Sequence, residues 1–60
     1  MNKNEIARGI VKKMTKDEQV EFLKTDILPP IKLSQKEMNF IKGGGLSLVN
    51  LVAEKDMKFD

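Results

Sequence analysis

The first third of the chain places apolar and polar residues at helical spacing. Positions 6, 10, 11 and 14 are apolar, and this spacing puts them on one face of a helix. Gly9 lies inside the stretch and weakens such a helix by about 1 kcal/mol relative to alanine. The pattern predicts a first amphipathic helix, whose apolar face consists of Ile6, Ile10, Val11 and Met14.

A second helix is predicted to begin directly after Thr15. Thr15 and Glu18 have the spacing of a capping box, in which each side chain accepts a hydrogen bond from the backbone N–H of the other residue. The helix must end before the Pro-Pro pair at 29–30, because proline lacks a backbone N–H and disfavours helical geometry in the residue before it. We therefore expect an extended linker over 28–32. The apolar positions of this helix are Val20, Phe22, Leu23 and Ile27.

A second capping box, Ser34 with Glu37, predicts a third helix of about two turns. Leu33, just before the cap, is placed to pack on Met38 as a hydrophobic staple, and Ile41 continues the apolar stripe. An isolated helix of this length is barely populated in water, because nucleation is costly and few hydrogen bonds offset it. Its apolar face therefore needs a surface to dock on, in this chain or in another.

The composition excludes most catalytic chemistry. The 60 residues contain no Cys and no His, so disulfides, zinc-finger sites, thiol catalysis and histidine-based acid–base chemistry are excluded. The carboxylates are scattered, and so short a chain buries only about 60% of the surface that its unfolded form exposes. We expect a protein that is not an enzyme and that uses no cofactor or metal ion.

The net charge of +2 is slight, and it narrows the range of partners. A nucleic-acid-binding protein normally has a concentrated basic stripe, whereas the densest basic stretch here, 12–16, is followed at once by acidic residues. No apolar run approaches the roughly 20 residues that span a bilayer, and the polar residues 1–5 are not those of a secretory signal peptide. We therefore expect no nucleic-acid partner, no stable membrane span and no signal peptide.

Three consecutive glycines at 43–45 divide the chain into two unlike parts. Residues 1–44 hold nine basic and six acidic residues, a net charge of +3, whereas residues 45–60 hold two and three, a net charge of −1. Gly43 suits the left-handed C-terminal cap of the third helix. The second part shows neither clean helical nor clean strand periodicity. The expected fold class is mainly α, with two to three short helices and a flexible or disordered C-terminal segment.

Residues 33–44 read LSQKEMNFIKGG. This segment resembles the double-glycine leader motif of bacteriocin, peptide-pheromone and other ribosomally made peptide precursors, commonly written L-S-x-x-E-L-x-x-I-x-G-G. Six positions match the motif outright, and Met38 replaces the usual leucine with a side chain of similar volume. The matching residues are Leu33, Ser34, Glu37, Ile41, Gly43 and Gly44.

The resemblance implies that the cysteine-protease domain of a peptide exporter cuts the chain after Gly44. The precursor is then cytoplasmic and its product, residues 45–60, is secreted. A short amphipathic helix can lay its apolar face into a groove, with Glu37 meeting a basic group at the rim, and glycines pass a narrow protease channel because they lack a Cβ. Cleavage after Gly45 instead would place Leu33, Glu37 and Ile41 one residue too far from the cleavage site to match the motif. The expected recognition and cleavage residues are Leu33, Glu37, Met38, Ile41, Gly43, Gly44 and Gly45.

The residues before the motif exceed what an unmodified bacteriocin precursor needs. By the same resemblance we expect them to dock a peptide-modifying enzyme, through the candidate face Ile6, Ile10, Val11, Val20, Phe22, Leu23 and Ile27. Without Cys, thioether rings and thiazoles are excluded, which leaves dehydration, side-chain cross-links and backbone methylation. The candidate modified residues are Ser47, Lys55, Asp56, Lys58, Phe59 and Asp60. The negative charge of the product disfavours membrane lysis, because anionic lipids attract cationic peptides.

A second interpretation belongs to a different class of protein. In it, the intact chain is a small helical interaction or regulatory protein, with 43–45 as a loop and the last segment docked on the first three helices. A precursor tail is expected to show random-coil amide exchange. The intact domain instead requires its tail to pack, and the contacts expected are those of Leu48, Leu51 and Val52 with Ile10, Phe22 or Ile27.

Overall fold

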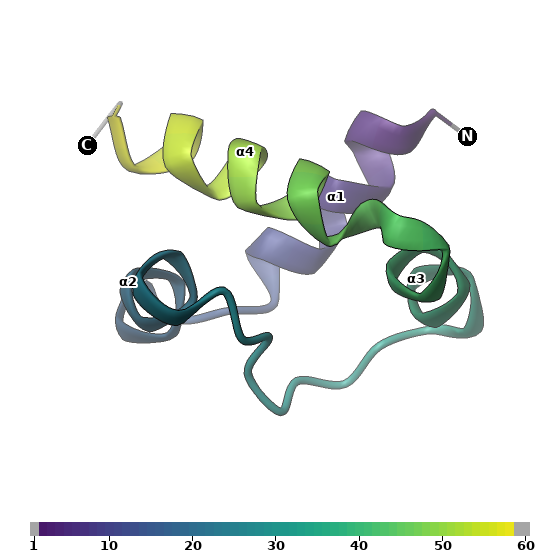
Figure 1. Cartoon of the computed structure of the whole chain (residues 1–60), viewed down its shortest axis with the longest axis horizontal. Coiled ribbons are helices and arrows are strands. Elements are labelled where there is room, and N and C mark those ends of the chain that lie inside the picture. The colour runs from purple at the N-terminus through teal and green to yellow at the C-terminus, as the bar shows by residue number, and fades with distance from the viewer. Residues whose placement is uncertain (1, 59–60) are drawn as a thin grey trace.

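The computed structural model describes residues 2–58 and the side chains of residues 2–56. Over these residues four α-helices follow one another, and a short segment, η1, which is kinked at Gly44, joins the last two (Figure 1). The elements are α1 (Lys3–Lys12), α2 (Lys16–Thr25), α3 (Gln35–Phe40), η1 (Ile41–Gly45) and α4 (Leu46–Lys58). No strand occurs in this described part of the chain, and the mainly helical fold class is confirmed.

Polar residues fix the starts of the first three helices. Before α1, the Asn2 side chain accepts a hydrogen bond from the Glu5 backbone N–H at 2.9 Å. Before α2, the predicted capping box is present: the Glu18 N–H donates to Thr15 Oγ1 at 3.2 Å, and the Thr15 N–H donates to Glu18 Oε1 at 2.8 Å. The box predicted before α3 is also present. Each box gives partners to two N–H groups that a helix start leaves unpaired, so these boundaries follow from local sequence.

The end of α2 is set by Asp26 rather than by the prolines. Asp26 has a left-handed φ of 58°, and its N–H donates to the Phe22 carbonyl at 2.8 Å. Aspartate is one of the few residues other than glycine that visit this region. Asp26 also accepts a hydrogen bond from the Asn50 side-chain amide at 2.8 Å, which ties the end of α2 to α4. The following residues, 27–34, reach α3 without a helix, as the Pro-Pro pair predicts.

The core lies between α1 and the helices that cover it. In Figure 1, α4 crosses α1, with α2 and α3 at opposite ends of α4, and the contact between α1 and α4 is the most extensive in the fold. The largest fully buried side chains are those of Phe22, Ile10, Val11 and Val49. Among the side chains that the structure describes, the buried apolar cluster consists of Ala7, Ile10, Val11, Met14, Phe22, Val49 and Ala53.

The segment that the sequence led us to expect as flexible forms helix α4. Val49 and Ala53 are 0% exposed, and both belong to the core. Of the three tail residues expected to pack, Leu48 and Val52 are half-buried against the core cluster, whereas Leu51 is 49% exposed. The physical reason is the apolar face of α1, which α2 alone does not cover. Because Val49 and Ala53 are four residues apart, they form one narrow stripe of small side chains that can approach this face.

Candidate functional site

The double-glycine segment forms the junction between α3 and α4 (Figure 1). Gly43 and Gly44 are exposed, and Gly45 is half-buried. The bond between Gly44 and Gly45, at which the motif implies cleavage, therefore lies at the end of η1, one residue before α4 begins. No residue of η1 is buried.

Two of the three glycines are required by the fold. Gly44 has a φ of 94° and a ψ of 15°, and it is the residue of η1 with non-helical dihedral angles. Residues with a Cβ rarely adopt such a φ. A Cβ on Gly45 would lie 2.5 Å from Cε2 of Phe40, so the half-buried ring would have to move to admit a side chain there. The left-handed residue that the sequence placed at Gly43 is thus Gly44.

Gly43 has no such structural reason. Its dihedral angles are helical, its surface is exposed, and a Cβ built on it meets no heavy atom within 4 Å. Alanine would fit at this position and is favoured over glycine in a helix by about 1 kcal/mol. The fold therefore gives no steric reason for glycine at position 43.

Glu37 joins α3 to α1. It is 9% exposed, and its Oε1 accepts hydrogen bonds from Nζ of Lys13 and, at 2.8 Å, from the Ser34 backbone N–H. Its Oε2 lies 3.3 Å from the position that a Cβ on Gly9 would occupy. Gly9 and Lys13 are four residues apart and so share one face of α1. Together they form what we term the Glu37 socket.

The hydrogen bonds in this socket favour the charged form of Glu37. The bond from the Lys13 ammonium, followed by that from the Ser34 backbone N–H, holds the pKa of Glu37 below its usual range, although burial acts in the opposite direction. Glu37 is therefore a carboxylate near neutral pH. Its negative charge is already paired within the chain.

The other motif side chains divide between the core and solvent. Leu33 and Ile41 are half-buried and pack against the core cluster. Met38 faces outward and is 40% exposed. Of the four side chains expected to contact a protease, only that of Met38 is exposed in this fold.

The candidate docking face for a modifying enzyme lies mostly inside the molecule. Ile10, Val11 and Phe22 are buried in the core, whereas Ile27 is 71% exposed. The half-buried members are Ile6, Val20 and Leu23. Helical periodicity singled out these positions because they are apolar, and in the fold most of them pack in the chain's own core and are not free to bind a partner.

The candidate modified residues lie on α4 or beyond it. Ser47, Lys55 and Asp56 are exposed. The side chain of Lys58, together with Phe59 and Asp60, lies outside the part that the structure describes. Ser47 is thus accessible to an enzyme only one residue after the start of α4.

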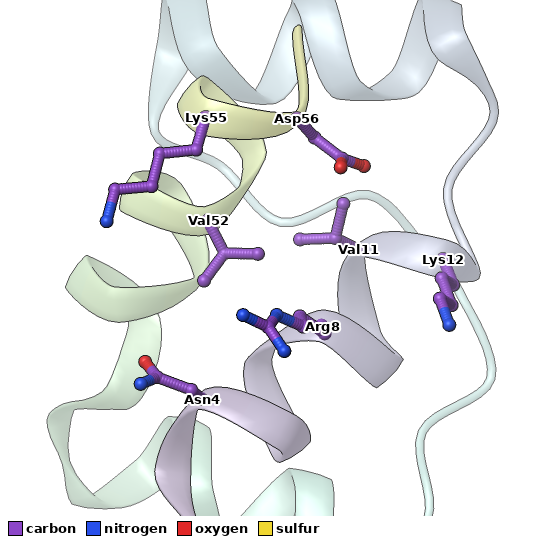
Figure 2. Close-up of a pocket in the computed structure, with 7 residues that line it drawn as sticks. All are labelled: Asn4, Arg8, Val11, Lys12, Val52, Lys55 and Asp56. Carbon is purple, nitrogen blue, oxygen red and sulfur yellow. The ribbon is translucent and has the colours of Figure 1, made fainter. Parts of the chain in front are cut away.

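An open cleft of about 260 Å³ follows the seam between α1 and α4. Figure 2 shows Val11 and Val52 facing each other across it, with the Arg8 guanidinium nearby, while Lys12 and Lys55 extend in opposite directions. The charged groups do not converge on one point as they would around a ligand. Asn4 and Asp56 complete the lining. The cleft marks where the tail lies on α1.

The described residues hold no group of three His, Cys, Asp or Glu side chains placed to bind a metal ion. None of the helices described has the length and apolar composition that crossing a membrane requires.

Sequence patterns missed three residues that shape this site. Gly9 was noted only as a weak point in a helix, Lys13 as a polar position, and Phe40 as a neighbour of the apolar stripe. The one available signal was a glycine inside a helix four residues before a lysine, because a helical glycine often marks close approach of another backbone or side chain.

Comparisons of the chain with protein-family models, with curated proteins and with solved structures found no match. The double-glycine resemblance thus rests on residues 33–44 and on the environment of its glycines.

Proposed function

We propose that the chain is the precursor of an exported, post-translationally modified peptide. Residues 1–44 act as the leader, which a peptide-modifying enzyme and the cysteine-protease domain of a peptide exporter recognise. The protease cuts between Gly44 and Gly45, and residues 45–60 are the product. The precursor resides in the cytoplasm and the product is secreted.

The environment of Gly43 is the observation that supports this proposal most strongly. Gly44 and Gly45 have structural reasons to be glycine, but Gly43 is exposed, helical and free of steric restriction. Glycine at this position lowers helix stability without a compensating contact. A protease channel that excludes a Cβ at the two residues before the cut explains the residue.

Cleavage requires η1 to become extended, since a narrow channel admits only an extended backbone. The turn comprises five residues, of which only Ile41 packs against the core cluster, and its two exposed glycines, Gly43 and Gly44, lose no side-chain contacts when it unwinds. Segments of this kind open locally at far lower free energy than the whole fold. The turn can therefore enter the protease while α1 and α2 remain folded.

Cutting this bond separates the tail from the leader as a covalent unit. After cleavage α4 remains on α1 only through non-covalent contacts, chiefly those of Val49 and Ala53. An isolated helix of 13 residues is marginally stable in water, so the product should lose much of its helix once it leaves the leader.

The test is incubation of the full chain with a double-glycine protease domain, followed by mass spectrometry of the fragments. The expected products are residues 1–44 and 45–60, and the chain with Gly43→Ala should remain whole. A chain that stays intact under conditions that process a known double-glycine leader would overturn the proposal.

The burial of Val49 and Ala53 favours a second candidate function. A tail that packs into the core also suits an intact helical interaction protein, in which η1 is a structural loop. The two candidates differ in what residues 1–44 do alone. As a leader they still bind the protease, whereas as part of an intact domain they lose their function with α4. Competition for the protease by the chain truncated after Gly44 distinguishes the two.

A further inference from the structure

The side chains that a protease would recognise on α3 face the rest of this chain. Leu33 and Ile41 pack against the core, and Glu37 is 9% exposed, so that Met38 alone points outward. A helix that docks in a groove does so with its apolar face and its charged contacts turned toward the partner. The folded precursor therefore holds its recognition face against its own body.

The Glu37 socket is what holds that face. Lys13 supplies a cation to Glu37 Oε1, and Gly9 supplies the space beside Oε2. Apart from the neighbouring residues and backbone of α1 itself, Glu37 Oε2 is the one heavy atom of the described side chains and backbone within 4 Å of a Cβ built on Gly9. The absence of a side chain at position 9 thus serves this one contact, which accounts for a glycine inside α1 despite its cost to the helix.

We propose that α1 masks the leader by competing with the protease for the same face of α3. The inference rests on the proposed function. The chain exchanges between a closed state, with Glu37 in its socket, and a minor open state in which α3 has left α1 and can dock on the protease. Cleavage proceeds from the open state alone.

The masking sets how readily the chain is processed. The apparent affinity for the protease equals the affinity of the open state reduced by the fraction of chains that are open. A basic group on the protease takes the place of Lys13, so Glu37 exchanges one ion pair for another and is not left as an unpaired buried charge. The leader is thereby kept from non-cognate proteases that lack such a group.

Two substitutions open the socket in different ways. Lys13→Met removes the cation and keeps the length of the side chain. Gly9→Leu fills the space beside Oε2, while leucine favours α1 over glycine, so it opens the socket without weakening the helix. Lys12→Met is the matched control, because it removes a neighbouring exposed cation that does not contact Glu37.

The measurement is kcat/KM for release of residues 45–60 from each full-length chain, with amide hydrogen exchange in α3 recorded in parallel. We expect both socket variants to be cut at least about fivefold faster than the wild type, with faster exchange in α3 and unchanged exchange at Val49, and the Lys12→Met chain to match the wild type.

The outcomes separate the inference from the proposed function. If the wild type is cut and the socket variants are cut no faster or more slowly, the masking inference fails and the precursor proposal stands. If no chain is cut while a known leader is processed, the precursor proposal fails and the inference falls with it. Faster cutting of Lys12→Met to the same degree would show a charge effect in place of masking and would also refute the inference.

Discussion

Replacing Gly43 with alanine separates the needs of the fold from those of the protease. The substituted Cβ meets no heavy atom within 4 Å, and the dihedral angles at this position are helical. Alanine should therefore stabilise the folded chain by about 1 kcal/mol through its higher helix propensity. For a chain of this size, that corresponds to a rise in Tm of about 4–8 °C, which thermal unfolding followed by circular dichroism can resolve.

The same substitution should nearly abolish cleavage. A gain of about 1 kcal/mol can lower the population of an open state by only about fivefold. A steric block in a channel without room for a Cβ acts on every open chain, so we expect the initial rate of release of residues 45–60 to fall by well over that factor. Mass spectrometry of timed samples measures this rate directly.

Gly44→Ala is the matched comparison. At a φ of 94° alanine is strained, and the substitution should destabilise the fold by about 1–2 kcal/mol. The two variants thus shift stability in opposite directions, while both should resist the protease. If Gly43→Ala is cut within about fivefold of the wild type, the glycine is not a protease requirement and the reasoning is refuted. A fall in the Tm of Gly43→Ala would refute the account of the turn itself.

Three further predictions concern the packing around the junction. Val49→Ala should lower the free energy of unfolding, measured by urea titration, by about 2 kcal/mol because it leaves a cavity in the core. Leu51→Ala removes more atoms but from an exposed side chain, so it should change the free energy of unfolding by less than about 1 kcal/mol. Equal effects of the two substitutions would contradict the packing of α4. Gly45→Ala should destabilise the fold by about 1–3 kcal/mol because the added Cβ meets the Phe40 ring. A double-mutant cycle with Phe40→Ala should show that the two substitutions are energetically coupled. Additive effects would count against this contact. The pKa of Glu37 is lower in the folded chain than in the unfolded chain, so its contribution to stability is complete above the unfolded-state pKa and is lost as the pH falls through the folded-state pKa. Glu37→Gln should therefore flatten this acidic part of the curve of unfolding free energy against pH. If the curves of the wild type and the variant run parallel there, the ion pair is not supported.

The local features of the fold could be predicted from the sequence. Both capping boxes formed where the Thr15–Glu18 and Ser34–Glu37 spacings placed them, because each involves groups only three residues apart. The mainly helical class followed from apolar periodicity for the same reason. The end of α2 was harder to place, since the prolines set only the outer limit and Asp26 took the left-handed conformation first.

The tail shows what local pattern does not contain. Its apolar residues are so closely spaced that several helical faces are equally apolar, and helical periodicity favoured the face of Leu48, Leu51 and Val52. In the fold Leu48 and Val52 do pack against the core, but Leu51 is exposed, and the fully buried residues are Val49 and Ala53, which are small enough to let α4 approach α1 closely. That choice depends on the shape of the opposite surface, which lies about 40 residues away along the chain.

The sequence by itself determined where α2 and α3 begin, that Cys and His are absent, and where the double-glycine pattern lies, because all of these depend on residue type and on spacings within one or two turns. Only the tertiary structure decided that the tail packs on α1, that Glu37 is paired with Lys13 beside Gly9, and that Gly43 alone among the three glycines is not required by the fold. These properties arise from contacts between segments far apart in the chain, and such contacts form only when the whole apolar surface is buried together.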